Sequence, residues 1–432
     1  MAPPKSWLSI PEDSDFSLAN IPFGIIRSKF SDGHRPAIPI GNHVLDLKAF
    51  SSAGGFAELT SFPKEHLSVF DSTTLNDFAA LGQKTHENVR KYIQDVFSES
   101  TSHPEILKDN SELQKAALLP KHETKNLLPM KIGDYTDFYA GYNHAFNAGC
   151  LFRDPENALK PNYTHLPVGY HGRASSVVVS GTPIHRPQGQ ILPPGSQTPI
   201  HGPSKKLDIE LELGCLLCTS NPMGTSLKLN GDAEEAIFGY VLMNDWSSRD
   251  IQRWEYVPLG PFNGKNFGTT ISPWVVLPGA LEPYRVKKLE NKTELLPYLQ
   301  EKRQDTVYDI SLSIDLTIGG DEDPATTTIA KVSSSNLLWS FPQMIAHHTM
   351  GGCPMNVGDL LGSGTISGTS KNELGSLLEM GKDGKEGEEL MLAGMNTRKW
   401  LLDGDVATFR GKAGEGVGFG ECTGRVVGTS KH

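Results

Sequence analysis

The chain has 432 residues, of which 38% are hydrophobic and 21% charged, so its apolar side chains suffice for a large buried core and exclude disorder throughout. Its 40 lysines and arginines against 50 aspartates and glutamates give a net charge of -10, which disfavours non-specific binding to nucleic acid. No stretch approaches the ~18 apolar residues of a membrane-spanning helix, and 44 glycines with 29 prolines favour many turns and short strands.

The five cysteines are too few, and odd in number, for the disulfide framework of a secreted protein. The first residues, MAPPKSWLSIPEDSDF, contain no apolar segment of the kind found in secretory signals. We therefore expect reduced thiols and a soluble cytoplasmic protein that interacts with neither membranes nor nucleic acid.

Residues 1–128 are predicted to form an N-terminal domain. Strand-like runs separated by glycine and polar turns, a pattern typical of a small barrel, lie at residues 23–26, 37–40 and 43–47. Between residues 74 and 97, apolar side chains recur at three- and four-residue steps, which predicts an amphipathic helix that closes this unit. Residues 98–129 are polar and carry prolines, so we expect a linker there and a domain boundary near Pro129.

Residues 129–432 are predicted to form a second domain built mainly from strands. Strand-like segments lie at residues 176–179, 207–217, 236–243, 274–277, 309–318 and 405–409. Helical periodicity is scarce, and residues 340–347 are the best short candidate. These features predict a large antiparallel or mixed β architecture. The charged or polar segments 286–308 and 381–389 are predicted to be exposed loops.

Three carboxylates alternate with apolar residues between Leu207 and Leu213. In a strand this alternation places Asp208, Glu210 and Glu212 on one face. A solvated acidic face is the simplest interpretation of the pattern taken alone. Like charges this close repel each other, however, so a cation bound between the two glutamates would relieve an electrostatic cost.

Asp245 ends a second apolar run and precedes a helix-like segment. A catalytic group at the strand end and a helix N-cap are about equally good interpretations of this residue. Arg249 and Gln252 are three residues apart and would share one helix face, from which their donors project together.

An aromatic-rich segment at residues 134–144 brings acidic, phenolic and imidazole groups together in Asp137, Tyr139 and His144. Carboxylate oxygens suit Ca²⁺ or Mg²⁺, whereas zinc or copper would require more imidazole or thiolate ligands. Acids from several segments, if gathered in the fold, would therefore form a site for a hard cation.

Three other motifs do not meet the requirements of the chemistry they suggest. Cys215 and Cys218 have C-x-x-C spacing but continue an apolar strand and lack a second pair, so core packing is favoured over a redox or zinc site. Residues 260–265 have one residue too few between their glycines for a phosphate-binding loop, and residues 362–368 have one too many for a dinucleotide fingerprint. ATP binding is not supported.

Longer segments carry a resemblance to a known family. They are PEDSDF at 11–16, HLPVGYHGRASS at 165–176, LDIELE at 207–212, NDWSSRDIQ at 244–252, WEYVPLGPF at 254–262, GKNFGTTISPW at 264–274, GSGTISG at 362–368 and LE at 378–379. Together they resemble the fumarylacetoacetase family of eukaryotic type. The resemblance implies a mainly β fold, with an N-terminal SH3-like barrel domain in residues 1–128 and the family's catalytic mixed β-roll in residues 129–432, assembled as a homodimer.

The activity implied by the resemblance is metal-dependent hydrolysis of a carbon–carbon bond. The small-molecule substrate would be 4-fumarylacetoacetate, and the products fumarate and acetoacetate, in the last step of tyrosine and phenylalanine breakdown. The implied cofactor is Ca²⁺ or Mg²⁺, or both. One departure from the family lies just before His144, where residues 140–143 read AGYN, and it affects a substrate contact or a loop position.

The resemblance also assigns roles to individual residues. The metal ligands would be Asp137, Glu210, Glu212 and Asp245, with Lys265 and Thr269 near a second cation through their backbone. The catalytic residues would be His144 as general base, Glu379 as the acid that orients it, and Arg249, Gln252 and Lys265 as donors to the oxyanion. The substrate contacts would be Tyr139, Arg153, Tyr170, Gln252, Tyr256 and Thr365.

The chemistry explains why these residue types are needed. Hydrolysis next to a β-diketone requires an activated water, stabilisation of a tetrahedral oxyanion and an electron sink for the departing enolate. An imidazole such as that of His144 suits the first task because its unperturbed pKa lies near neutral pH.

Other functions fit part of the pattern. A related hydrolase, isomerase or decarboxylase acting on an acylpyruvate or a 2-keto acid would share the acidic residues but would lack the N-terminal arm and the segment YHGR at 170–173. A non-catalytic, calcium-stabilised scaffold would use the acids structurally and leave His144 without a role. A redox or zinc module at Cys215 and Cys218 would lose its function when both are replaced by alanine.

Overall fold

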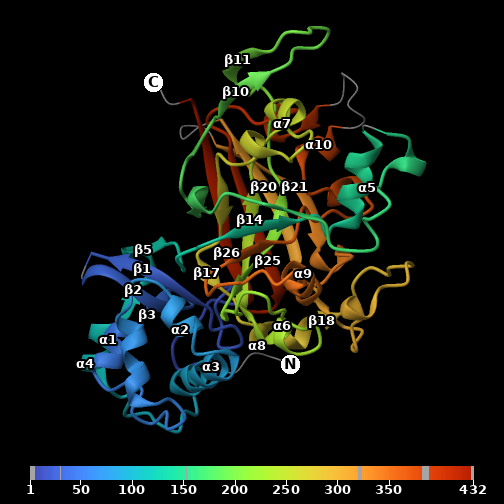
Figure 1. Ribbon diagram of the computed structural model, residues 1–432. Helices are drawn as coiled ribbons and strands as arrows, with labels where there is room; N and C mark the ends of the chain where they lie inside the picture. The colour runs from blue at the N-terminus through green and yellow to red at the C-terminus, as the bar shows by residue number, and fades with distance from the viewer. Residues whose placement is uncertain (1–4, 30, 152, 320–323, 382–388, 430–432) are drawn as a thin grey trace.

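A computed structural model describes residues 5–29, 31–151, 153–319, 324–381 and 389–429. Three large β-sheets form its framework, with short helices around and between them (Figure 1). The prediction of a mainly β protein is confirmed. Among the helices within those five ranges, none has the length and apolar character that crossing a membrane requires.

The first sheet is built mostly from the N-terminal part of the chain, drawn in blue at the lower left of Figure 1. Its strands, in spatial order, are β17 (Trp274–Val275), β1 (Phe23–Ser28), β2 (Ser31–Ile40), β3 (His43–Asp46) and β4 (Leu118–Pro120), with β5 (Thr124–Leu127) also paired to β1. The helices beside it are α1 (Leu47–Ser52), α2 (Asn76–Ala79), α3 (Gln83–Phe97) and α4 (Ser111–Ala117). The SH3-like form of this unit and the boundary near Pro129 stay predictions.

The linker predicted for residues 98–129 is wrong, because α4, β4 and β5 lie in this segment. Val44 on β3 pairs with Leu119 on β4, and Ile25 on β1 pairs with Leu127 on β5. The two added strands have only three and four residues, too few to display an alternating pattern. Their hydrogen-bond partners lie far earlier in the chain, so local sequence could not reveal them.

The single helix predicted over residues 74–97 is also wrong in extent. The chain forms α2 and α3 with a break at Gly82, whose φ of +81° lies in the region that favours glycine. The predicted amphipathic face is confirmed within α3, where Val89, Ile93 and Val96 are buried.

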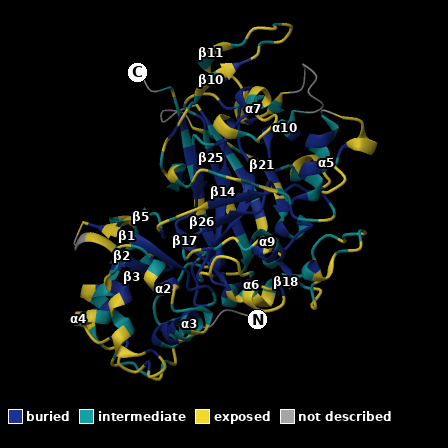
Figure 2. Cartoon of the chain, in the orientation of Figure 1, coloured by how far each residue is buried: buried dark blue, intermediate teal, exposed yellow. Residues whose placement is uncertain are grey.

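The second sheet crosses the centre of the molecule. In spatial order its strands are β7 (Gly169–His171), β6 (Tyr135–Phe138), β22 (Leu360–Gly362), β13 (Leu211–Leu217), β14 (Ile237–Asp245), β16 (Thr269–Ile271) and β8 (Val177–Val179). Every residue of β13 and β14 is buried, as the dark centre of Figure 2 shows. Burial on both faces explains why β14 is a nearly continuous apolar run.

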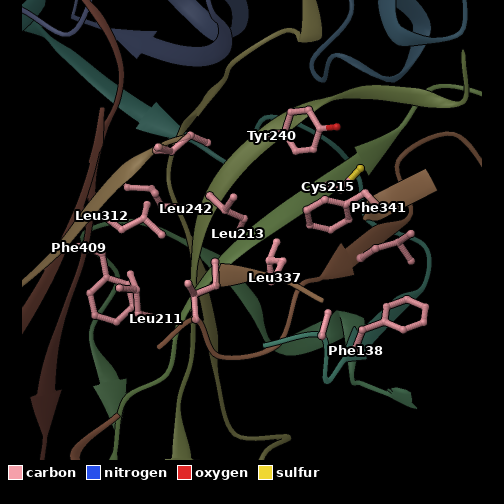
Figure 3. Packing of buried hydrophobic residues seen from close by; sticks show 14 of the residues in the cluster. Phe138, Leu211, Leu213, Cys215, Tyr240, Leu242, Leu312, Leu337, Phe341 and Phe409 are labelled. Carbon is pink, nitrogen blue, oxygen red and sulfur yellow. The ribbon is translucent and has the colours of Figure 1, made fainter. Parts of the chain in front are cut away.

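The third sheet packs against one face of the second. Its strands are β21 (Ala325–Ser333), β20 (Ser311–Ile318), β25 (Val406–Gly414), β26 (Val417–Val427) and β9 (Ile184–His185). Leu211, Leu213 and Leu242 of the second sheet lie in one apolar cluster with Leu312 and Phe409 of the third (Figure 3). On the opposite face, Leu216, Val241 and Met243 belong to the cluster of the N-terminal unit, so the two predicted domains share a core.

Shorter elements complete the fold. The two-stranded sheets are β10 (Gln188–Ile191) with β11 (Ile200–Pro203), β12 (Leu207–Asp208) with β15 (Ser247–Ser248), β18 (Arg285–Val286) with β19 (Val307–Tyr308), and β23 (Leu390–Met391) with β24 (Thr397–Arg398). The remaining α-helices are α5 (Tyr142–Cys150), α6 (Asp232–Glu235), α7 (Arg249–Glu255), α8 (Pro278–Leu281), α9 (Phe341–Thr349) and α10 (Leu377–Met380). The 3-10 turns are Lys64–Asp71, Lys121–Glu123, Pro155–Asn157, Ala174–Ser176, Phe262–Gly264, Glu282–Tyr284, Pro297–Leu299, Ser334–Asn336, Lys371–Glu373 and Ala393–Met395.

The predicted short helix at 340–347 is confirmed as α9, which Ser340 caps through a capping box. The predicted loop at 286–308 is correct only in part, because it carries the short strand β19 and buries Leu299. Residues 382–388 of the other predicted loop lie outside the described residues.

The cysteines behave as the core-packing interpretation predicts. All five are free thiols in the described structure. Cys215 lies in the cluster between the second and third sheets, whereas Cys218 lies in the cluster of the N-terminal unit. Burial raises the pKa of Cys215 well above its ordinary value and that of Cys218 to about 12, so neither is a reactive thiolate at neutral pH.

His86 on α3 predicts a pH dependence of folding stability. Its Nε2 lies 3.0 Å and 2.9 Å from the carbonyl oxygens of Phe78 and Ala79, and its Nδ1 is buried without a partner among the described residues. Burial lowers the pKa of His86 from 6.5 to about 4, outweighing those two hydrogen bonds. Between these values the unfolded chain binds a proton that the folded chain does not, so stability falls as pH decreases below 6.5.

The expected loss between pH 7 and pH 5 is about 2 kcal/mol, because each pKa unit corresponds to about 1.4 kcal/mol. We expect His86→Gln to unfold at a lower temperature at pH 7 but to lose less stability between pH 7 and pH 5 than the unsubstituted chain. Thermal unfolding midpoints across this range measure the difference. If the unfolding midpoint changed with pH equally in the two proteins, the pH dependence of stability could not be assigned to His86.

Candidate active site

Acidic residues gather at one edge of the central sheet. Asp137 lies near the end of β6, and Asp245 is the last residue of β14. Glu212 lies at the start of β13, which runs antiparallel to β14 and β22 and therefore begins where those strands end. Gly362 at the end of β22 pairs with Asp137, which places β6 in register with the others. The sheet thus brings distant parts of the sequence to one edge.

Four carboxylates form a compact cluster at this edge. They belong to Asp137, Glu210, Glu212 and Asp245, and one oxygen from each lies within 4.8 Å of the others. All four residues are buried, so the interpretation of Glu210 and Glu212 as part of a solvated acidic face is wrong. Asp245 is not a helix N-cap either, since α7 begins after Ser248.

The cluster has the properties of a site for a hard cation. Asp137 Oδ1 and Glu212 Oε1 are buried and have no hydrogen-bond partner within the described part of the chain. Burial and then the neighbouring charge of Asp245 raise the pKa of Asp137, while burial and then Asp137 raise the pKa of Glu212. A bound dication would lower both pKa values by attraction, and oxygen ligands alone are the donor set that Ca²⁺ and Mg²⁺ prefer.

Backbone approaches the cluster at two glycines of the segment 362–368. A Cβ at Gly362 would lie 2.4 Å from Asp137 Oδ1 and 3.0 Å from Glu212 Oε2, so a side chain there would displace the carboxylates. Gly364 has a φ of +78°, and its backbone N–H donates to Glu212 Oε2 at 3.0 Å. These contacts explain why glycine, and no residue with a side chain, fits at positions 362 and 364.

Two cations border the cluster. Lys265 Nζ contacts Glu210 and lies 2.6 Å from Asp245 Oδ2, while Arg249 Nη2 lies 2.8 Å from Glu210 Oε1. Burial alone would raise the pKa of Glu210, but Lys265 and then Arg249 outweigh it and hold the value at about 2. Burial alone would lower the pKa of Lys265, but Asp245 and Glu210 raise it above the ordinary value. Glu210 is therefore ionised and Lys265 protonated at neutral pH.

Asp245 receives two further hydrogen bonds. Thr269 Oγ1 donates to its Oδ1 at 3.1 Å, and the Tyr170 hydroxyl donates to its Oδ2 at 2.8 Å. Thr269 lies opposite Asp245 in the register of β14 and β16, and Tyr170 lies opposite Asp137 in that of β6 and β7. Sheet register thus places both residues beside the acids.

A buried histidine–glutamate pair faces the cluster. His144 on α5 lies with Nδ1 2.6 Å from Glu379 Oε2 on α10, and its Nε2 is 3.9 Å from Glu210 Oε1. Glu379 also accepts hydrogen bonds from Asn147, Ser367 and Ser376 at 2.9, 2.9 and 2.8 Å. Burial alone would raise the pKa of Glu379, but His144 and the hydrogen bonds from Asn147 and Ser376 lower it overall.

The pairing defines what each imidazole nitrogen can do. Because the carboxylate of Glu379 is an acceptor, Nδ1 of His144 carries the proton and donates it in the hydrogen bond. The Nε2 lone pair then points toward the acidic cluster and can accept a proton there. The rings of Tyr139 and His144 pack perpendicular to each other, with ring centroids 5.6 Å apart.

Arg249 and Gln252 share a helix face, as their spacing predicts. Arg249 Nη1 donates to Gln252 Oε1 at 3.2 Å, and Arg249 Nε donates to Asp208 Oδ2 at 2.8 Å. Asp208 therefore does not join Glu210 and Glu212 in the cluster. The strand predicted over 207–217 is interrupted after Asp208, where β12 ends, and resumes at Leu211.

The remaining predicted substrate contacts are Thr365, Arg153 and Tyr256. Thr365 is buried and directly follows Gly364. Arg153 is exposed and donates to the carbonyl oxygen of Ala158, and Tyr256 is 51% exposed after the end of α7. No hydrogen bond or ion pair joins Arg153 or Tyr256 to the four acids among the residues that the structure describes.

Sequence reasoning missed several residues that support the pair of His144 and Glu379. Asn147 lies three residues after His144 on the same helix, a spacing that could have been noticed. Ser367 and Ser376 offered no comparable local signal. Within the departure at residues 140–143, Asn143 donates to the backbone carbonyl oxygen of Ser367 at 2.9 Å.

Comparisons with known proteins place this geometry in a family. The sequence model of the protein family "Fumarylacetoacetate (FAA) hydrolase C-terminal" matches residues 135–427. That of the family "Fumarylacetoacetase N-terminal" matches residues 19–129. The chain belongs to the fumarylacetoacetase family. Among its relatives in that family, the fumarylacetoacetase of Emericella nidulans is 58% identical over 98% of both chains. Those of Arabidopsis thaliana and Homo sapiens are 45% and 44% identical over 99% and 98% of both chains.

A solved structure extends the comparison to the fold of the fumarylacetoacetase family. The fumarylacetoacetate hydrolase from Exiguobacterium antarcticum superposes with a TM-score of 0.51, covering 94% of this chain and 99% of its own. Its sequence is 15% identical, so this likeness supports the fold alone.

Proposed function

We propose that this chain hydrolyses the carbon–carbon bond of 4-fumarylacetoacetate to give fumarate and acetoacetate. The observation that carries the proposal is the buried pair of His144 and Glu379, which faces four clustered carboxylates in a chain matching fumarylacetoacetases along nearly its whole length. The reaction would be the last step of tyrosine and phenylalanine breakdown.

His144 acts as the general base. Its Nε2 takes a proton from water while Glu379, held by three other donors, stabilises the resulting imidazolium through Nδ1. The hydroxide oxygen then adds to the ketone carbon next to the fumaryl double bond. This step forms a carbon–oxygen bond and moves the carbonyl electrons onto oxygen as an oxyanion.

Arg249, Gln252 and Lys265 act as donors to that oxyanion. Arg249 and Lys265 are fixed charges at the edge of the cluster, and preorganised donors of this kind stabilise the charge that develops in the transition state. When the oxyanion collapses, the carbon–carbon bond breaks and its electron pair leaves with the acetoacetate carbon. That carbon takes a proton, which balances the one that His144 Nε2 removed from water and so restores the base, and the hydroxide oxygen remains in the new carboxyl group of fumarate.

Asp137, Glu210, Glu212 and Asp245 hold a divalent cation, Ca²⁺ or Mg²⁺, in this proposal. A cation held there would supply Lewis-acid chemistry for the oxygens of the β-diketone. The backbone of Lys265 and Thr269 would lie near a second cation. Even with Lys265 and Arg249 beside them, four ionised carboxylates retain a formal excess of negative charge, which favours the dication.

Six residues contact the substrate in this proposal. They are Tyr139, Arg153, Tyr170, Gln252, Tyr256 and Thr365. Tyr139 packs on His144 and Tyr170 bonds Asp245, so both border the reacting groups. Arg153 and Tyr256 are both exposed, and a guanidinium in such a position can attract an anionic substrate.

The rest of the assignment concerns assembly and location. We propose a cytoplasmic homodimer in which the N-terminal unit is an SH3-like barrel. A relative that acts on an acylpyruvate or a 2-keto acid is the alternative. It is less favoured, since the match includes the fumarylacetoacetase N-terminal model over residues 19–129.

The test compares two substrates with the purified protein. Loss of the ultraviolet absorbance of fumarylacetoacetate is followed alongside release of pyruvate from an acylpyruvate at equal concentration. We expect kcat/KM for fumarylacetoacetate to exceed that for the acylpyruvate by at least about 100-fold, a difference of about 3 kcal/mol in transition-state binding. Faster turnover of the acylpyruvate would replace the proposal by the alternative.

A further inference from the structure

Asp208 is a fully buried carboxylate outside the four-acid cluster, and the mechanism above gives it no role. Its side chain accepts four hydrogen bonds, from Ile209 N at 2.7 Å and Leu377 N at 2.7 Å to Oδ1, and from Leu378 N at 3.0 Å and Arg249 Nε at 2.8 Å to Oδ2. One carboxylate therefore binds the guanidinium of Arg249 and the start of α10 at the same time.

The contact with α10 replaces the usual helix cap. The first backbone N–H groups of a helix need acceptors, which the N-cap side chain commonly provides. Here the N-cap residue Ser376 makes no side-chain cap, and its hydroxyl instead donates to Glu379 Oε2 at 2.8 Å. Asp208 accepts the N–H groups of Leu377 and Leu378, so it anchors the turn that carries Glu379.

The backbone around Asp208 is held by other bonds. β12 pairs with β15, with Asp208 opposite Ser247, and the backbone N–H of Arg249 donates to the carbonyl oxygen of Lys206 at 2.9 Å. These bonds join β12 to the start of α7 without the Asp208 side chain. The side chain instead orients two functional groups, the guanidinium of Arg249 and the carboxylate of Glu379.

We propose that Asp208 is a positioning residue for the hydrolysis, holding the oxyanion donor Arg249 and the base-orienting Glu379 in a fixed relation to each other. Its bond to Nε of Arg249 leaves Nη1 and Nη2 directed toward Gln252 and Glu210. Its bonds to α10 place Glu379 2.6 Å from Nδ1 of His144. The inference rests on the function proposed above.

Asp208→Asn tests this role because it keeps the shape of the side chain but removes its charge. The new amide cannot accept all four hydrogen bonds, since one of its two polar atoms is a donor. We expect kcat for fumarylacetoacetate to fall by about 100-fold, with KM changed by less than about threefold, as for a lost transition-state contact. The Kd for Ca²⁺, measured by calorimetry, is expected to stay within about twofold.

Asp250→Asn is the matched control. Asp250 is also buried, and it accepts hydrogen bonds from Ser204 and Lys205 near the start of α7 without touching a reacting group. We expect Asp250→Asn to lower the unfolding temperature while keeping kcat within about twofold. If Asp208→Asn behaves in the same way, Asp208 is merely structural and the inference is overturned.

A double variant adds a readout that a structural role would not move. If Asp208 acts partly through Arg249, the losses in kcat from Asp208→Asn and Arg249→Lys do not multiply when combined. Losses that multiply would contradict the inference. If Asp208→Asn does not fold, Asp208→Glu carries the same test, because it keeps the charge and displaces the carboxylate by one methylene. Absence of turnover in the unsubstituted protein would overturn the proposed function itself, and this inference with it.

Discussion

Replacing His144 with alanine is expected to lower kcat for fumarylacetoacetate by about 10²- to 10⁴-fold, the usual effect of losing a general base. Nε2 of His144 is the imidazole nitrogen that faces the acidic cluster, and Nδ1 is occupied by Glu379. None of the four clustered acids is removed, so the Kd for Ca²⁺ is expected to change little. Steady-state kinetics and calorimetry measure the two effects on the same preparation.

His122→Ala is the control for this prediction, since His122 is exposed in a turn of the N-terminal unit. It is expected to leave kcat unchanged. Full activity in His144→Ala would exclude the histidine as the base. The non-catalytic scaffold would be supported if neither the unsubstituted protein nor His144→Ala showed turnover while both bound Ca²⁺ equally well.

Replacing Glu212 with glutamine is expected to have opposite effects on stability without and with metal. Glu212 is buried within 4.8 Å of three other acids, and burial and then Asp137 raise its pKa. Glutamine removes one of the repelling charges, so the metal-free protein is expected to unfold at a higher temperature. It also removes a charged oxygen ligand, so the Kd for Ca²⁺ is expected to rise by at least about 100-fold, beyond the usual effect of losing a supporting contact.

Thermal unfolding in chelator and in excess Ca²⁺ measures both effects. Adding Ca²⁺ is expected to raise the unfolding temperature of the unsubstituted protein by a large amount and that of Glu212→Gln by a small amount. Glu415→Gln, at an exposed position, serves as the control for loss of one negative charge. A Ca²⁺ shift in Glu212→Gln equal to that of the unsubstituted protein would show that the cluster is not the metal site.

Part of the site could be predicted from local sequence. The alternation at residues 207–213 correctly placed Glu210 and Glu212 together, and the end of an apolar run correctly placed Asp245 at a strand terminus. Such patterns report which face a side chain occupies. They do not report which strands become neighbours, so only the family resemblance joined Asp137 to the other acids.

The wrong predictions concern the linker at residues 98–129 and the position of Asp208, and both arose because local sequence patterns do not report which strands pair or where a strand is interrupted. β4 and β5 are short strands whose partners lie early in the chain, and no periodic pattern marks them. Asp208 follows the same alternation as Glu210, yet β12 ends at Asp208 and its carboxylate binds Arg249 and α10. An interruption of one strand thus separated residues that a regular strand would keep on one face.

The most direct measurement is the hydrolysis of fumarylacetoacetate by the purified protein before and after removal of divalent cations with a chelator. The account predicts that turnover is lost on chelation and returns when Ca²⁺ or Mg²⁺ is added back. It also predicts that Glu212→Gln recovers only at much higher cation concentrations. Full turnover in the chelated protein would contradict the central claim that the four clustered carboxylates hold a metal required for the reaction.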